Sequence, residues 1–432
     1  MKTTVSQEGP TKVRISVEAT PDEVAPAVER AFERLAGEVK VPGFRQGKVP
    51  RKVLEARLDA DQIREASLQE AVPLLWRQAM TESDVSPISL PDIEVRSYDD
   101  QGLAFDALFE VRPEINLPDF SQISVERPQA SVTDEELDEQ LARLQDRFAT
   151  LETVTRPAHS GDFALIDLKG YVHDKEVPEA SATDLLYEVG SERFVPELDR
   201  ELEGKRQGDI LKFNATLPET YPGEFGGQEI TFQVLVKEIR QKNIPALDDE
   251  FAKSASEFDT LDELRADVRT RIEDLKRVSA DAEVRNRLLE KVIEQASVPV
   301  PEALANDEMS YRAARLSDQL RAAGVSLEQY LERTGQTEEQ ITEDLRRQAE
   351  RNVAAQLILD EVGKREELEA SEEDVQAELL THAQALQKEP EELRESLVSG
   401  GRLGALSADI IRRKALDLIV ERAEVKEESE PV

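Results

Sequence analysis

The sequence of 432 residues contains no cysteine, which excludes disulfide bonds, thiolate nucleophiles and cysteine-based metal sites. It has no run of about 18 consecutive apolar residues, so no transmembrane helix is expected. Its first twenty residues, MKTTVSQEGPTKVRISVEAT, lack the apolar stretch of a signal peptide. Aromatic residues are only 5% of the chain, so few large rigid side chains can fill compact cores. These absences predict a cytoplasmic protein.

Motifs for nucleotide and metal chemistry are also missing. Neither G-x-x-x-x-G-K-[ST] nor the Rossmann G-x-G-x-x-G occurs. The glycine-rich SGGRLGALS, residues 399–407, lacks the Lys-Ser/Thr ending and is expected to join two helices. The histidines His159, His173 and His382 are isolated from one another, which disfavours a metal site or a catalytic triad. We therefore expect no metal and no small-molecule cofactor.

Charge is plentiful and mostly negative. Charged residues are 34% of the chain, and the formal net charge is −37. Residues 39–57 are the exception, with six basic residues and one acidic residue. Most of the protein should repel nucleic acid, whereas this segment could contact it.

The apolar periodicity predicts a first unit of mixed α+β structure. Alternation of apolar residues indicates strands, and spacings of three and four indicate helices. Thr20 is a plausible N-cap before Pro21. Strands are predicted over 11–17, 92–98 and 102–113, and helices over 21–40, from Pro50 onward, and through 63–76.

Two further regions follow. Residues 113–129 are proline-rich and read as an extended linker, and 133–154 as a helix opened by a Thr133/Glu136 capping box. A period of two from about residue 156 predicts a compact, mostly antiparallel β domain with one short helix. From residue 246 nearly everything is helical, up to a frayed acidic tail at 425–432.

The predicted fold class is therefore multidomain α+β. An α+β N-terminal domain occupies residues 1–112, and an antiparallel β domain occupies 151–243. Residues 113–150 form a linker and a helix expected to pack with the all-α domain at 244–432. That last domain lacks a sustained heptad repeat, which favours several packed helices over one coiled coil.

One motif gives this organisation a family. GFRQGKVP, residues 43–50, matches the G-F-R-x-G-K-x-P signature of the bacterial trigger factor family at every fixed position. The order of domains resembles that family over the whole chain. The resemblance implies a ribosome-binding domain, an FKBP-like prolyl isomerase domain and a helical chaperone domain with arms.

For the signature loop, the resemblance implies docking at the tunnel exit of the large ribosomal subunit, against a ribosomal protein and ribosomal RNA. Gln46 departs from the family, which often has a third basic residue there. The alternative is that Phe44 only packs beneath a helix hairpin. The implied ribosome-binding residues are Gly43, Phe44, Arg45, Gln46, Gly47, Lys48 and Pro50.

For the β domain, the resemblance implies a peptidyl-prolyl cis-trans isomerase. Leu168, Val177 and Leu198 replace aromatic residues usual in FKBPs, and Pro178 replaces an aspartate. We therefore expect reduced isomerase activity; the alternative is a degenerate domain kept for binding or spacing. The implied pocket residues are Leu168, Val177, Leu185, Phe194, Val195, Leu198, Tyr221 and Phe232.

For the helical domain, the resemblance implies ATP-independent binding of nascent and unfolded polypeptides on exposed apolar patches, with a possible homodimer when the protein is free. The same periodicity would arise from internal helix packing. A primarily enzymatic isomerase and a non-catalytic ribosome-linked scaffold remain alternative functions. The candidate client-binding residues are Met309, Tyr311, Leu316, Leu320, Leu357 and Ile358.

Overall fold

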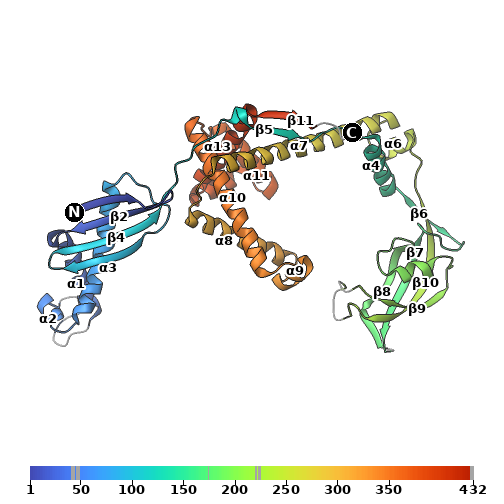
Figure 1. Cartoon of the computed structure of the whole chain (residues 1–432). Coiled ribbons are helices and arrows are strands. Elements are labelled where there is room, and N and C mark those ends of the chain that lie inside the picture. Colours follow the sequence, from blue (N-terminus) through green and yellow to red (C-terminus); the bar gives the residue numbers. More distant parts are fainter. Residues whose placement is uncertain (40–43, 45–48, 174, 219–220, 222–224, 429–432) are drawn as a thin grey trace. The chain divides into compact units, whose positions relative to one another are not determined.

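The computed structural model describes residues 1–39, 44, 49–173, 175–218, 221 and 225–428 (Figure 1). The chain forms two compact units. Unit 1 contains Met1–Pro128 and Asp281–Val432, and unit 2 contains Gln129–Ala280. Unit 1 is thus assembled from two segments distant in sequence, whereas unit 2 is one continuous segment.

The N-terminal part of unit 1 is an antiparallel sheet with the strand order β1-β2-β4-β3, against which α1 and α3 pack. Strand β2 buries Val13, Ile15 and Val17 on one face, as its alternation predicted. Strand β1 was not predicted, because most of its residues are polar and exposed. The bounds are β1 (Lys2–Gln7), β2 (Lys12–Ala19), α1 (Pro21–Glu38), α2 (Arg51–Glu55), α3 (Ala60–Glu82), β3 (Asp92–Asp99) and β4 (Gly102–Glu110).

The linker prediction is wrong for residues 120–127, and the prediction of a frayed tail is wrong for residues 425–427. The 3-10 helix η1 (Phe120–Gln122) and strand β5 (Ser124–Arg127) lie in the former segment. Strand β5 pairs in parallel with β11 (Glu424–Glu427) at the other end of the chain. Each strand supplies hydrogen-bond partners that the other lacks locally, so neither is visible as a strand by itself.

Helices make up the rest of unit 1. Their shared core includes Phe120, Ile123 and Val125 from the N-terminal segment, together with apolar residues of α7, α10 and α13. Helix α7 runs through the boundary between the two units. The bounds are α7 (Leu261–Ala296), α8 (Glu302–Ala322), α9 (Leu327–Thr334), α10 (Glu338–Arg365), α11 (Glu372–Leu386), α12 (Pro390–Ser399) and α13 (Leu403–Arg422).

Unit 2 contains the predicted antiparallel β domain. Its sheet has the order β6-β10-β7-β8, and β9 pairs with a different stretch of the long strand β10. The bounds are β6 (Thr150–Val154), β7 (Phe163–Val172), β8 (Lys175–Glu188), α5 (Pro196–Leu202), β9 (Ile210–Thr216) and β10 (Glu229–Asn243).

Unit 2 also contains α4 (Asp134–Arg147) and α6 (Asp249–Ala255), which share an apolar cluster with the start of α7. Helix α4 opens with the predicted Thr133/Glu136 capping box, but it ends at Arg147 and not near 154. Beyond it, the Phe148 ring packs edge-on against Phe251, with the ring centroids 5.9 Å apart. This contact outside the helix and the pairing of β6 with β10 replace the predicted last turns.

Candidate functional sites

The predicted isomerase pocket is one apolar cluster in the β domain. Its eight predicted residues lie together: Leu168, Val177, Val195, Leu198 and Phe232 are buried, and Leu185, Phe194 and Tyr221 pack against them half-buried. Strands β7, β8 and β10 supply the walls, and helix α5 supplies Leu198. Period-two alternation places Leu168 of β7 and Phe232 of β10 on the buried face of the sheet.

Aromatic rings retain one side of this pocket. The Phe194 ring meets Phe232 edge-on at 5.5 Å and Tyr221 at 6.3 Å between centroids. Such edge-to-face pairs are favourable beyond their buried area. The Tyr221 hydroxyl donates a hydrogen bond to the carbonyl oxygen of Glu179, at 2.6 Å. Leu168, Val177 and Leu198 add aliphatic side chains to the same buried cluster.

The sequence reasoning missed two aromatic residues of this cluster. Phe213 on β9 lies 5.7 Å from Phe232 between ring centroids, and Phe225 packs against the same core. Phe213 lies two residues from both Leu211 and Ala215, which are buried, and so shares their face of the strand. The strand pattern therefore carried a signal for it. Phe225 lies in a loop, where no periodicity could identify it.

Of the signature residues 43–50, the structure describes Phe44, Val49 and Pro50. Phe44 is described, and its side chain is 44% exposed. Pro50 is the N-cap residue of α2 and is exposed. The other predicted docking residues, Gly43, Arg45, Gln46, Gly47 and Lys48, lie outside the described residues.

The C-terminal side of this loop is well anchored. Val49 is buried in a small cluster with Phe32 and Leu54. The Arg51 guanidinium lies 4.3 Å from the centre of the Phe32 ring and forms ion pairs with Glu29 and Glu55. Lys52 and Arg57, in contrast, are exposed. The segment 49–57 thus combines a packed base, at Val49 and Leu54, with exposed cations at Lys52 and Arg57.

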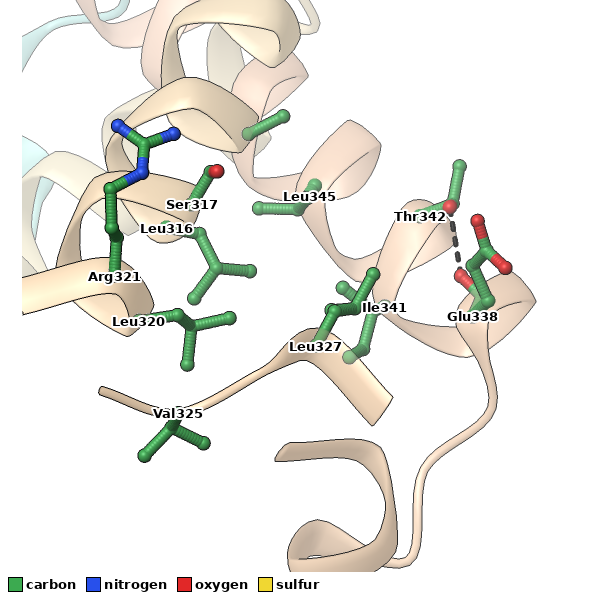
Figure 2. A pocket seen from close by; sticks show the side chains of 11 residues that line it. Leu316, Ser317, Leu320, Arg321, Val325, Leu327, Glu338, Ile341, Thr342 and Leu345 are labelled. Carbon is green, nitrogen blue, oxygen red and sulfur yellow. Dashed lines mark hydrogen bonds between the residues drawn. The ribbon is translucent and has the colours of Figure 1, made fainter. Parts of the chain in front are cut away.

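The third site is an apolar cavity between α8, α9 and α10, which we call the arm groove (Figure 2). Its volume is about 380 Å³. In Figure 2, Leu316 and Leu320 from α8 lie across from Ile341 and Leu345 from α10. The apolar residues that define the arm groove are Leu316, Leu320, Val325, Leu327, Ile341 and Leu345.

The structure divides the candidate client-binding residues. Leu316 and Leu320 line the arm groove half-buried, Met309 is half-buried on α8, and Tyr311 is 59% exposed. Leu357 and Ile358 are only 4% and 0% exposed. Their predicted exposure is wrong, because the second half of α10 packs into the helical core of unit 1.

Two further findings concern metal binding and membrane-spanning helices. Among the described residues, no group of three or more histidine, aspartate and glutamate side chains is placed to hold a metal ion. None of the helices in the described part of the chain has the length and apolar character needed to span a membrane.

A β domain with a packed aromatic cluster and helices that carry an open apolar groove are features suited to a protein that binds other polypeptides. Comparison with known families agrees. Residues 1–144 match the family model described as bacterial trigger factor protein, and residues 260–421 match the model of its C-terminus. Residues 154–239 match FKBP-type peptidyl-prolyl cis-trans isomerase.

Whole-chain relatives give the same result. Trigger factors of Parafrankia sp. (strain EAN1pec) and Nocardia farcinica are 38% and 39% identical to this chain. Each alignment covers 98% of this chain, and 83% and 91% of the respective relative. The chain belongs to the trigger factor family. It is a chaperone with an FKBP-type isomerase domain, and binding to ribosomes and nascent chains follows from the family.

A solved structure supports the fold. It is a trigger factor chaperone described for promiscuous substrate recognition in folding and assembly activities. The two chains superpose with a TM-score of 0.61 at 22% identity, over 98% of this chain and 99% of that one. The multidomain α+β prediction is thereby confirmed.

Proposed function

We propose that the chain docks at the tunnel exit of the large ribosomal subunit through residues 43–50 and there binds nascent chains without ATP. The observation that carries the proposal is Phe44, a large apolar side chain left 44% exposed in the basic segment 39–57 of a very acidic chain. The cations of this segment suit the phosphates of ribosomal RNA, and the ring of Phe44 suits an apolar patch on a ribosomal protein. Such a site places the protein in the cytoplasm.

Ribosome co-sedimentation tests this docking. The variant Phe44→Ala/Arg45→Ala/Lys48→Ala should lose most pelleting with ribosomes at physiological salt. A matched control, Ile210→Ala/Arg193→Ala/Lys212→Ala, removes one exposed apolar residue and two cations from the β domain and should pellet like the wild type. Equal pelleting of the loop variant and the wild type would contradict the proposal.

Gln46 should affect how salt weakens the attachment. Each phosphate contact made by a cation steepens the dependence of binding on salt concentration. Gln46→Lys should therefore tighten binding at low salt and steepen its decline as salt rises. An unchanged salt slope would mean that residue 46 lies away from ribosomal RNA.

Unfolded and nascent polypeptides are proposed to bind the arm groove, together with Met309 and Tyr311 beside it. Aliphatic side chains that are open to solvent can cover apolar segments of many sequences and release them without an energy source. Leu316→Ala/Leu320→Ala should weaken suppression of aggregation of a denatured client. The control Leu380→Ala/Leu386→Ala removes two exposed leucines from α11 instead, and equal loss in both variants would exclude a specific role for the groove.

The isomerase is proposed to be slower than an FKBP with a full aromatic wall. Leu168, Val177 and Leu198 form an apolar side without flat rings to clamp a proline. Turnover of an Ala-Leu-Pro-Phe peptide, followed by NMR, should be low and should fall further in Phe194→Ala. Leu186→Ala, an exposed change on strand β8 of the same domain, is the control. Wild-type turnover equal to that of a typical FKBP would contradict the proposal.

Self-association of the free protein is the last element of the proposal. The apolar surface that is open for clients is equally available to a second copy when no client is bound. Sedimentation velocity should detect a homodimer at high concentration, and a saturating unfolded client should dissociate it. A monomer at all concentrations would remove this element and leave the others intact.

A further inference from the structure

One carboxylate accepts hydrogen bonds from two residues of the loop that connects β8 to α5. Asp199, which is only 8% exposed, lies on α5. Its oxygens accept hydrogen bonds from the backbone N–H of Gly190 at 2.6 Å and of Glu192 at 3.1 Å, and from the Tyr187 hydroxyl at 2.8 Å. Charged acceptors make hydrogen bonds stronger than neutral ones do. A single side chain therefore fixes three points around the loop.

The loop needs such a restraint. Gly190 has a φ of +86° and Glu192 a φ of +50°, so two of its residues occupy the left-handed region. For a residue with a side chain that conformation is unfavourable and persists only where the surroundings enforce it. The carboxylate, which holds both N–H groups, is the group that enforces it here.

The restrained loop carries a wall of the isomerase pocket. Phe194, two residues after Glu192, packs edge-on against Tyr221 and Phe232. Val195 follows it, and Leu198, next to Asp199 in sequence, forms part of the buried core of the pocket. A shift of the loop would move Phe194 relative to Phe232, while Leu198 would stay with its helix.

We propose that Asp199 is a positioning residue of the prolyl isomerase: it sets the place of Phe194 through the loop 190–194. Asp199 contacts the loop and not the substrate, so its effect passes through the aromatic wall. The inference rests on the isomerase activity of the domain. In a pocket whose other side is aliphatic, the position of this ring matters more, because fewer rigid groups define where a proline can lie.

Tyr187 completes the arrangement. Burial raises the pKa of the Tyr187 hydroxyl to about 12, and its hydrogen bond to Asp199 acts in the same direction. The hydroxyl is therefore protonated, and able to donate, throughout the pH range of an isomerase assay. It anchors the carboxylate to the end of β8, which gives the loop a fixed reference in the sheet.

The test compares Asp199→Asn with Asp162→Asn in the full-length chain. Asp162 is a matched control, since it is 4% exposed in the same domain and its side chain bonds to Arg156 and to the His159 amide. Its contact with the loop, at Val189, is made by its backbone, which the substitution leaves unchanged. The peptide Ala-Leu-Pro-Phe serves as substrate, with turnover from NMR exchange and affinity from amide shifts. Asp199→Asn should lower kcat/KM by about tenfold or more, within the ~100-fold that a 1 Å misplacement can cost. Tyr187→Phe should lower it less.

The outcomes separate positioning from stability. Support requires that Asp162→Asn keeps wild-type kcat/KM at a temperature where both variants are folded, and that Asp199→Asn changes the amide signals of Gly190 and Glu192. Equal kcat/KM in Asp199→Asn and the wild type overturns the proposal, as does an equal loss in both variants. A wild-type chain that neither binds nor turns over the peptide overturns it differently, because the isomerase assignment itself then fails.

Discussion

The FKBP-type domain and the arm formed by α8, α9 and α10 use apolar residues in opposite ways. Residues 151–243 hold eight aromatic residues, most of them in one packed cluster. After residue 258 the only aromatic residues in the sequence are Tyr311 and Tyr330. Helix α9 is described throughout and none of its residues is buried, and in α8 the buried residue is Ala305.

The difference reflects two kinds of binding. A pocket that acts on one X-Pro bond benefits from rings held in fixed mutual positions, because misplacement is costly in rate. A surface that holds many unfolded sequences benefits from aliphatic side chains that adapt and remain accessible. The arm therefore has little core packing of its own and keeps its apolar side chains accessible. Its stability has to come from the shared helical core of unit 1, which contains the second half of α10.

The largest expected effect tests the packed side of this comparison. Phe232→Ala removes the ring that touches both Phe194 and Phe213, and it should lower the free energy of unfolding of the β domain by about 3–5 kcal/mol. Urea unfolding followed by NMR signals of that domain measures the change. A loss below about 1 kcal/mol would show that the aromatic cluster is not the core of the domain.

The second prediction compares a buried residue of α10 with a groove residue of α8. Ile358→Ala, at a fully buried site in the body, should cost about 2–5 kcal/mol. Leu320→Ala in the arm groove should cost less than about 1 kcal/mol, because the side chain is already partly hydrated, yet it should weaken client binding. Equal unfolding costs for the two variants would remove the distinction between body and arm.

The third prediction concerns acid stability of the β domain. Burial tends to raise the pKa of Asp162, but the Arg156 guanidinium and the His159 amide outweigh it, and the pKa lies below its ordinary value of 3.8. The stabilisation is therefore complete above pH 3.8 and is lost as the pH falls further. Asp162→Asn should flatten this acid decline of unfolding free energy in pH titrations. A decline equal to that of the wild type would mean that other carboxylates cause it.

The smallest expected effect lies on the exposed face of the arm. Arg346 and Glu350 form an ion pair one helical turn apart, 3.1 Å between nitrogen and oxygen, with both side chains largely exposed. Arg346→Ala should change the free energy of unfolding by no more than about 0.5 kcal/mol. Thermal unfolding at low and high salt would detect a larger contribution. Such a result would mean that surface charge stabilises the arm as well as solubilising it.

Local patterns in the sequence predicted most elements but not their remote partners. Helix α1 was predicted over residues 21–40 and is observed over Pro21–Glu38. The prediction is close because the Thr20 N-cap and the apolar spacing are both local signals. Strand β11 was missed because its pairing partner, β5, lies about 300 residues earlier in the chain. Helix α4 was predicted too long because the contact of Phe148 with Phe251 is tertiary.

The candidate sites show the same division. The isomerase pocket residues came from resemblance, and alternation in the strands is consistent with their placement together. Leu357 and Ile358 could not be distinguished from groove residues, because buried and open helix faces have the same period. Asp199 carried no signal at all: an aspartate in an acidic helix resembles a solvated one until its three donors are seen.

The parallel pairing of β5 with β11 also dictates an order of completion during protein synthesis. The N-terminal sheet is finished by residue 110, and every residue of unit 2 has been made by residue 280. The helical body, in contrast, needs residues 424–427 to close against a strand made about 300 residues earlier. A chaperone that receives unfinished chains is itself, until residues 424–427 are translated, a chain whose β5 strand lacks its partner.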